Sequence, residues 1–440
     1  MNLPSKNSLT QVYGESEKSS LRFKKLSETF AVNFGHETAE YFSSPGRTEI
    51  IGNHTDHNGG KVIAASIDMD TIAAALPNGS DIIRIISEGY EEEIIIDLKN
   101  LPKDHSESAG LSDESKAASS YNRQTTSALV TGICEAALKS GFMVSGFDAY
   151  VTTSVISAAG VSSSASFEML ICSIINYFFN ENSMDCTDYA RIGQYAENVY
   201  WNKASGLLDQ MACAVGGPIL LDFSDKNNIY CKKINLSFEK YGYNLILVNT
   251  GKGHADLGKE YSEIPLEMKE AASVLNADRL CESNIGSLLN NILNIKNDRA
   301  ILRAMHFFEE NSRVDKALYA IENNNIEELL IQIKESGTSS WEWLQNCCCP
   351  QDFTEQKIPL ILALTQLFIQ NISSYPKYTG VKNICKGVCR VHGGGFAGVI
   401  ICIIRKEEKN SYIKYISRYV GKENVYSLSL RDTGAIHLDM

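Results

Sequence analysis

Strand-like and helix-like segments occupy separate blocks of the chain, and this arrangement restricts the fold class. Short β-rich runs fill residues 48–97 and return at 217–250. Residues 265–375 show mainly the spacing of amphipathic helices, before strand signals reappear near the end. Because 440 residues are too many for one ordinary hydrophobic core, the pattern predicts an α+β protein with two domains.

The expected seam between these domains lies near residues 215–230, where strand signals return after a series of helices. We therefore expect an N-terminal domain over 26–222 and a C-terminal domain over 223–440. Residues 1–25 are polar and are expected to form a flexible lead-in. Residues 102–120 are rich in serine and contain charged residues of both signs, which predicts a polar loop.

The charge and the cysteine content argue against several classes of protein. The net charge is −12, and no Lys/Arg cluster marks a nucleic-acid-binding face. No apolar run reaches the roughly 18 residues of a membrane span, and the N-terminus lacks the features of a signal peptide. The twelve cysteines lack the CxxC spacing of a zinc site. We expect free thiols in a cytoplasmic protein, either monomeric or a homodimer.

Two glycine-rich patterns match nucleotide-binding motifs only in part. Residues 253–260, GHADLGKE, fit the GxxxxGK pattern of a P-loop, but Glu260 stands where Ser or Thr should hold Mg²⁺. Residues 393–398, GGGFAG, fit GxGxxG, yet a strand-like run follows where a helix should begin. Neither pattern predicts a conventional nucleotide site.

A better candidate for a phosphate site is residues 158–170, AAGVSSSASFEML, which precede an apolar helical run. A helix start carries unsatisfied N–H groups and a partial positive charge. Gly160 and the serines have little bulk, so a polyphosphate could approach these N–H groups closely. A serine hydroxyl can also ligate Mg²⁺. The alternative is an N-capped helix with a serine-rich beginning.

The stretch GRTEIIGNHTDHNGG, residues 46–60, gathers many polar side chains between glycines. His54, Asp56 and His57 could ligate a divalent metal, but no second ligand cluster accompanies them. A polar turn is another reading. A pocket for a polyol accounts best for the mixture, because carboxylate and imidazole groups can bridge neighbouring hydroxyls while Arg47 offers a positive charge.

A single carboxylate, Asp209, stands among apolar residues in SGLLDQMACAVGG, residues 205–217. Such an aspartate is often a helix cap. It could instead be a partly desolvated base with a raised pKa. Glu197 lies twelve residues earlier, on the preceding helical segment.

Taken together, these segments resemble the galactokinase family of the GHMP small-molecule kinase superfamily. The family pattern GRxNLIGEHTDYNxG is similar to the stretch at 46–60, and PxxxGLSSSAS is similar to ISAAGVSSSAS at 156–166. The triple-glycine motif resembles CRVHGGGFAGVIIC. QYAENVYWNKASGLLDQ and NTGKGHADLGKEY also match family segments, so five similarities occur in family order between about 26 and 400. The resemblance implies an N-terminal mixed domain, a C-terminal ferredoxin-like domain with helical additions, and an active site between them.

The resemblance also implies the chemistry of the site. Asp209 would accept or orient the proton of a sugar's anomeric hydroxyl as its oxygen attacks the γ-phosphate of ATP. Arg47 would neutralise charge on Asp209 and on the transferring group. Phosphoryl transfer depends mainly on positioning and charge stabilisation, so one base, one cation and one metal ion can suffice.

Further roles follow from the same resemblance. Ser164 and Glu197 would hold Mg²⁺. The sugar hydroxyls would contact Asn53, His54, Asp56 and Tyr261, besides Arg47 and Asp209. The phosphates of ATP would be lined by Gly160, Val161, Ser162, Ser163, Ser164 and Ala165. The glycine loop near the nucleotide and substrate would consist of Gly393, Gly394 and Gly395.

The chain departs from the family pattern mainly where the sugar is selected. Asn53 replaces a glutamate, and an amide can donate as well as accept, so the contact with a hydroxyl is kept, weakened or redirected. Ile156 replaces the proline of the second motif, and Ala158 one of its glycines. His392 stands where threonine is commoner. After Tyr261 the family's arginines are missing, and Ile264 and Pro265 stand nearby.

The sequence therefore predicts an ATP- and Mg²⁺-dependent sugar-1-kinase, with galactose as the expected substrate. A kinase for another sugar, such as an amino sugar or a pentose, is an alternative suggested by Asn53. A non-catalytic sensor of sugar and ATP on the same scaffold is a more distant alternative, against which stand Arg47, Ser164, Glu197 and Asp209, all present.

Overall fold

The fold was analysed in a computed structural model of the chain. The predicted polar loop at 102–120 lies outside the residues that it describes, as does most of the candidate P-loop at 253–260. The described residues are 2–101, 125–156, 160–203, 205–251, 258–352, 354–372, 386–396 and 398–440.

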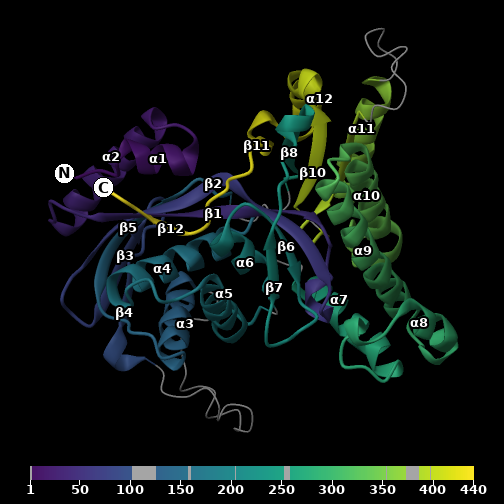
Figure 1. The fold of residues 1–440 in the computed structure, drawn as a ribbon, viewed down its shortest axis with the longest axis horizontal. Coiled ribbons are helices and arrows are strands. Elements are labelled where there is room, and N and C mark those ends of the chain that lie inside the picture. Colours follow the sequence, from purple (N-terminus) through teal and green to yellow (C-terminus); the bar gives the residue numbers. More distant parts are fainter. Residues whose placement is uncertain are drawn as a thin grey trace.

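A large sheet, here called the first sheet, forms the left half of the molecule in Figure 1. Its strands run in the order β12-β1-β2-β5-β3-β4. β6 pairs with the N-terminal part of β2, and β7 pairs with β6. All pairings are antiparallel except that of β3 with β5. The strands are β1 (Glu40–Ile51), β2 (Lys61–Pro77), β3 (Ile82–Ser87), β4 (Ile94–Asp97), β5 (Phe147–Thr153), β6 (Pro218–Asp222), β7 (Tyr230–Lys233) and β12 (Ile436–Leu438).

Four helices cover one face of the first sheet (Figure 1). Small side chains such as Ala73 and Ala75 on β2 allow the helices to pack closely, and both are fully buried. The helical run expected after the serine-rich segment is confirmed over Ser163–Phe179, and the helix over Thr126–Lys139 is capped by the Thr125 hydroxyl. The helices are α3 (Thr126–Lys139), α4 (Ser163–Phe179), α5 (Cys186–Tyr195) and α6 (Leu208–Val215), with a π-helical segment (Ala196–Tyr200) after α5.

The N-terminal segment is not the loose lead-in expected for residues 1–25. It forms α1 (Lys6–Tyr13) and α2 (Glu17–Phe34), which lie on the opposite face of the first sheet (Figure 1). Phe23, Leu26 and Phe30 recur at helical spacing, and all three are buried against the sheet. The prediction was wrong because the many polar residues on the outer face obscured this apolar stripe.

A smaller second sheet and a group of helices form the C-terminal part. The second sheet has the order β11-β8-β10-β9 and is entirely antiparallel. Ile50 and Ile63 of the first sheet share a hydrophobic cluster with Leu245 and Leu247 of the second, so the two parts pack together. The strands are β8 (Tyr243–Asn249), β9 (Gly387–His392), β10 (Val399–Arg405) and β11 (Val425–Leu428).

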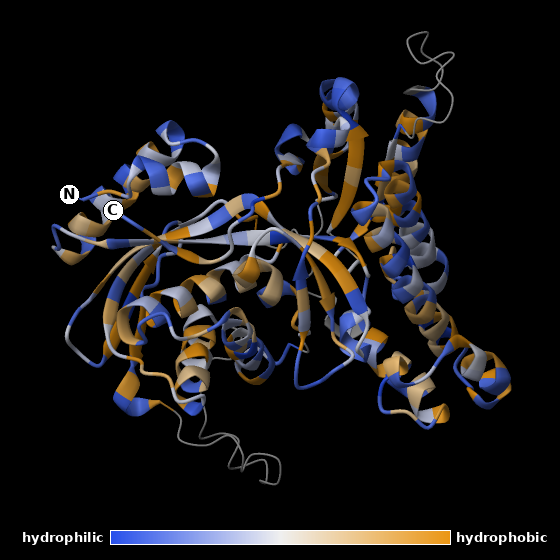
Figure 2. Cartoon of the chain, in the orientation of Figure 1, coloured by the Kyte–Doolittle hydropathy of each residue, from blue (hydrophilic) through white to orange (hydrophobic). Residues whose placement is uncertain are grey.

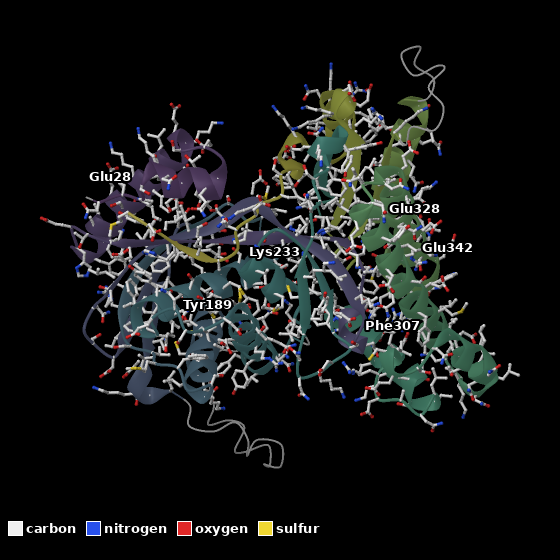
Figure 3. All side chains as sticks on the ribbon, in the orientation of Figure 1. Glu28, Tyr189, Lys233, Phe307, Glu328 and Glu342 are labelled. Atoms are coloured by element: carbon white, nitrogen blue, oxygen red, sulfur yellow. The ribbon has the colours of Figure 1, made fainter. Side chains whose placement is uncertain are left out.

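The helices of the C-terminal part lie mainly on the right of Figure 1. In Figure 2 their apolar residues alternate with polar ones, which agrees with the amphipathic spacing seen in the sequence. Figure 3 places Phe307 on α9, where it is fully buried, and Glu342 at the outer surface, where it is exposed. The helices are α7 (Gly258–Val274), α8 (Ile285–Asn291), α9 (Asp298–Glu322), α10 (Ile326–Ser339), α11 (Lys357–Ile372) and α12 (Lys409–Val420).

The architecture is α+β with two parts, as the sequence predicted. Along the chain, β7 is the last strand of the first sheet before the second sheet begins, and it ends at Lys233. The second sheet begins with β8 at Tyr243. β12 departs from this division, because the C-terminal strand returns to pair with β1. Every cysteine among the described residues is a free thiol. Within those same residues, no helix is long and apolar enough to cross a bilayer.

Candidate active site

A cavity of about 450 Å³, open to solvent, lies where the first sheet meets the C-terminal helices. Four parts of the chain line it: the end of β1 with the turn after it, the segment that leads into α6 with the first turn of that helix, Tyr261 on α7, and the loop at Gly393 and Gly394. The cavity therefore brings together motifs that lie far apart in the sequence.

Arg47 and Asp209 form an ion pair in the wall of this cavity. Nε and Nη2 of Arg47 donate to Oδ1 of Asp209 over 2.8 and 2.7 Å. Burial alone would raise the pKa of Asp209, but the charges of Arg47 and Lys203 and a hydrogen bond from Ser162 outweigh it, and the pKa falls to about 2. The raised pKa considered for Asp209 is thus contradicted, and the carboxylate is ionised at neutral pH.

The serine-rich segment at 160–164 is held against this ion pair. Arg47 donates through Nη1 to the carbonyl oxygen of Gly160, and its backbone N–H donates to Val161 O over 3.2 Å. A Cβ at Gly46 would lie 2.7 Å from Val161 O, so only glycine permits this approach. The Ser162 hydroxyl donates to Oδ2 of Asp209 over 2.7 Å.

The same helix start also contacts the second predicted carboxylate. The Ser164 hydroxyl donates to Oε1 of Glu197 over 2.8 Å. Glu197 lies in the π-helical segment after α5, a distortion that is common at functional sites. Burial raises its pKa, but Lys203, Ser205 and Ser164 together lower it below its ordinary value. Glu197 is therefore an ionised carboxylate beside the serine-led start of α4.

The remaining residues predicted to line the phosphates have mixed surroundings. Ser163 is half-buried at the first position of α4. Val161 and Ala165 are fully buried, and their side chains belong to the hydrophobic clusters beneath the loop. Those two side chains hold the loop in place, so only their backbone groups could face a ligand.

Aromatic and polar groups line the other side of the cavity. The His54 and Tyr261 rings lie 5.2 Å apart between centroids, and Nε2 of His54 donates to Gly394 O over 3.1 Å. Burial lowers the pKa of His54 to about 3, so its ring is neutral. A Cβ at Gly206 would lie 1.9 Å from Oδ2 of Asp56, which shows how closely these segments meet.

The metal reading of His54, Asp56 and His57 receives no support from this arrangement. Oδ1 of Asp56 lies 3.5 Å from Nε2 of His57, and the Tyr261 hydroxyl lies 3.5 Å from the same nitrogen. Across the described part of the chain, no group of three or more His, Cys, Asp or Glu side chains is arranged to hold a metal ion. The side chains form a hydrogen-bonding wall instead.

Asn53 is fully buried, and other protein groups already occupy its amide. Nδ2 donates to Oε1 of Glu49 over 3.1 Å and to Gly393 O over 2.9 Å. Oδ1 accepts from Nδ2 of Asn346 over 2.9 Å. Both ends of the Asn53 amide therefore bond to protein groups, while the residue still borders the cavity.

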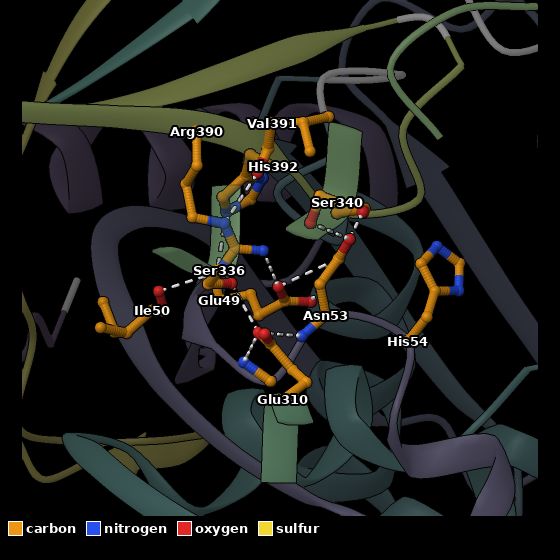
Figure 4. A network of polar contacts seen from close by, with 12 residues as sticks. Glu49, Ile50, Asn53, His54, Glu310, Ser336, Ser340, Arg390, Val391 and His392 are labelled. Atoms are coloured by element: carbon orange, nitrogen blue, oxygen red, sulfur yellow. Dashed lines mark hydrogen bonds and ion pairs between the residues drawn. The ribbon is translucent and has the colours of Figure 1, made fainter. Parts of the chain in front are cut away.

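A buried polar network behind the turn, shown in Figure 4, was not predicted from the sequence. Arg390 Nη2 donates to Oε1 of Glu49 over 2.5 Å, and Nη1 donates to Ile50 O over 2.9 Å. Glu310 on α9 accepts the backbone N–H groups of Gly52 and Asn53 over 3.0 and 3.2 Å. These contacts fix β1 and the turn after it to β9 and α9. The lone charge of Arg390 in the apolar run GVCRVH was an available signal, whereas Glu310 stands among other polar residues and gave none.

Two of the departures from the family pattern have structural explanations. Nε2 of His392 accepts from the Thr48 hydroxyl over 3.0 Å and from the Glu49 N–H over 3.2 Å, which joins β9 to β1. Ile264 is fully buried in the cluster of C-terminal helices, so it packs in the core. The predicted loop of Gly393–Gly395 connects the antiparallel strands β9 and β10, which excludes a dinucleotide fold there.

Comparisons with known proteins agree with this fold and site. Residues 28–77 match the galactokinase galactose-binding signature, and residues 128–217 match the N-terminal domain of GHMP kinases. A galactokinase of Clostridium tetani is 24% identical over 92% of this chain and 94% of its own length. A galactokinase of Clostridium perfringens is 28% identical over 90% of this chain and 94% of its own.

Solved structures share the whole fold. The crystal structure of Lactococcus lactis galactokinase complexed with galactose superposes with a TM-score of 0.76 at 24% identity, covering 94% of this chain and 99% of that one. Methanococcus jannaschii mevalonate kinase gives a TM-score of 0.58 at 14% identity, with 89% and 98% covered. The fold is one that solved kinases of the GHMP superfamily share, and the match at residues 128–217 agrees with that likeness. The galactose-binding signature and the curated relatives make the chain similar to galactokinases in particular, and they support a sugar kinase.

Proposed function

We propose that this protein transfers the γ-phosphoryl group of ATP to the anomeric hydroxyl of galactose, which yields galactose 1-phosphate and ADP. One observation carries the proposal: Asp209 is bonded both to Arg47 and to Ser162, so the candidate base, the candidate cation and the phosphate loop meet at a single point. The names of the relatives and the matched galactose-binding signature support galactose as the sugar.

Asp209 would act chiefly by orienting the sugar. With a pKa of about 2, its carboxylate is a weak base in the resting site. It accepts a hydrogen bond from the anomeric hydroxyl, whose oxygen then bonds to Pγ as the bond from Pγ to the β–γ bridging oxygen breaks. The hydroxyl proton becomes acidic during this step, passes to Asp209 and leaves to solvent. Arg47 offsets the negative charge that gathers on the transferred group.

Ser164 and Glu197 are suited to hold Mg²⁺. Their oxygens lie 2.8 Å apart at the start of α4, and oxygen atoms are the ligands that Mg²⁺ prefers. The ion usually completes its shell with substrate phosphates and water, so two protein ligands are enough. When bound, Mg²⁺ would neutralise charge on the β- and γ-phosphates.

The sugar would be held by the opposite wall of the cavity. Asp56 supplies an acceptor beside Gly206, while the neutral His54 and the Tyr261 hydroxyl supply polar edges. The missing side chain at Gly394 lets the glycine loop lie directly against this wall, since a Cβ there would lie 2.8 Å from the Tyr261 ring. These groups can bind hydroxyls at fixed positions on one face of a ring.

A kinase for a different sugar is the second candidate, and Asn53 favours it. Because the Asn53 amide is bonded to Glu49, Gly393 and Asn346, one hydroxyl contact of the family pattern is lost. A panel of hexoses, pentoses and amino sugars, with ADP formation as the readout, separates the candidates. Galactose should give the highest kcat/KM. Preferential turnover of another sugar would establish the second candidate, and no ADP with any sugar would contradict both.

A further inference from the structure

Lys203 is a cation of the cavity wall to which neither the sequence motifs nor the proposed mechanism gives a role. Nζ lies 2.6 Å from Oε1 of Glu197. The Lys203 side chain is 40% exposed, whereas that of Glu197 is 1% exposed. The lysine therefore covers the buried carboxylate on the side of the cavity, which it lines together with Arg47 and Asp209.

Two ion pairs, each made of one carboxylate and one cation, lie side by side in this part of the site. Arg47 is paired with Asp209, and Lys203 is paired with Glu197. Ser162 and Ser164, two residues apart at the start of α4, donate to Asp209 and Glu197 respectively. Both ion pairs thus border the loop at which the phosphates would bind. Lys203 and Ser164 share one acceptor, Oε1 of Glu197, so their donor atoms are neighbours.

The ammonium group has capacity for another ligand. It carries three N–H donors, and within the described ranges its one hydrogen-bond partner is Glu197. A lysine is a compact point charge on a flexible stem, and it can follow a phosphate without bidentate geometry. The transferring group carries charge on three oxygens, whereas all three guanidinium nitrogens of Arg47 are already bonded to Asp209 or Gly160.

We propose that Lys203 is a further catalytic residue, which binds the γ-phosphate of ATP and supplies the second positive charge at the transferred phosphoryl group. This inference rests on the proposed function for its choice of nucleotide. It differs from a structural role, in which Lys203 would merely neutralise Glu197. A residue that touches the γ-phosphate must distinguish ATP from ADP, whereas a structural cation need not.

The test compares nucleotide affinities of the whole protein, by titration calorimetry with ATP and with ADP, in EDTA and again in Mg²⁺. Lys203→Met should weaken ATP binding about tenfold and change ADP binding by less than about twofold. Lys203→Arg should retain most of the preference for ATP. The matched control is Lys232→Met, because Lys232 makes a comparable 2.7 Å ion pair with Glu322 at an exposed site.

Equal weakening of ATP and ADP, or no weakening of either, would overturn the proposal. If Lys203→Met lowers the melting temperature strongly, Lys203→Gln keeps a hydrogen bond to Glu197 without the charge and should show the same loss of preference for ATP. The test does not depend on the sugar. A wild-type protein that prefers ATP but phosphorylates no galactose would contradict the proposed substrate and leave the role of Lys203 supported.

Discussion

Arg47 and Asp209 stand 162 residues apart in the sequence, yet two guanidinium nitrogens of one bond the same carboxylate oxygen of the other. The pair places the start of the first motif beside the first turn of α6. Because Ser162 bonds the other oxygen of Asp209, the phosphate loop is fixed to the same point.

Glu197→Gln should raise the Mg²⁺ concentration needed for half-maximal activity by about tenfold, because an amide is a weaker ligand than a carboxylate. A Mg²⁺ titration at saturating ATP and sugar measures the shift. Glu322→Gln is the matched control, since Glu322 also pairs with a lysine, at 2.7 Å. An unchanged titration curve in the Glu197 variant would reject its role as a metal ligand.

Glu310 should make the stability of the protein sensitive to acid. Burial raises its pKa, but the surrounding basic groups, His306 and Arg313 first, lower it from 4.5 to about 2. A carboxylate with a depressed folded-state pKa stabilises the fold fully above the unfolded value of 4.5, and this contribution disappears as the pH falls toward about 2.

Glu310→Gln should therefore lower the free energy of unfolding at pH 7 by about 3 kcal/mol, and should flatten its decline between pH 4.5 and 2. Urea unfolding at several pH values gives both quantities. Glu309→Gln, at the half-buried neighbouring position, is the matched control. Parallel slopes for the wild type and the Glu310 variant would contradict the assignment.

Glu49 and Asn53 should behave as a coupled pair. The family pattern carries Asn and Glu in the reverse order at these positions, and here the two side chains meet at 3.1 Å. Asn53→Glu alone places two buried carboxylates together and should lower the free energy of unfolding by about 3 kcal/mol. The double variant Glu49→Asn/Asn53→Glu should recover roughly half of this loss.

Denaturant unfolding of the wild type, both single variants and the double variant gives the four free energies of unfolding of a double-mutant cycle for the Glu49–Asn53 pair. The KM for galactose in the double variant then reports whether a carboxylate at position 53 reaches the sugar. Strictly additive effects on stability would show that the two positions do not compensate each other.

Much of the fold could be predicted from the spacing of apolar residues along the sequence. The helix α4 and the strands β8 and β10 were predicted because long apolar runs with clear ends leave few alternatives. The helices α1 and α2 were missed because their buried stripe is narrow and the surrounding residues are polar. The strand β12 was missed because three residues carry too little pattern, and only its position beside β1 makes it a strand.

The candidate site was predictable to a lesser degree. Gly160, Ser162 and Asp209 were identified because helix starts and isolated carboxylates have direct chemical meanings. Their convergence rested on the family resemblance, since no local pattern encodes a contact over such a separation. The depressed pKa of Asp209 and the internal bonds of Asn53 arise from neighbours distant in sequence, and the residue types alone could not reveal them.

The rate at which galactose 1-phosphate forms from galactose and ATP, in the wild type and in Asp209→Asn, tests the central claim most directly. Phosphorus NMR identifies the product, and calorimetry confirms that the variant still binds galactose. The wild type should make the 1-phosphate with one ADP for each sugar, and the variant should be slower by about a thousandfold with its fold retained. A variant that works at nearly the wild-type rate would contradict the role of Asp209, and a wild type that makes no product would contradict the proposed reaction.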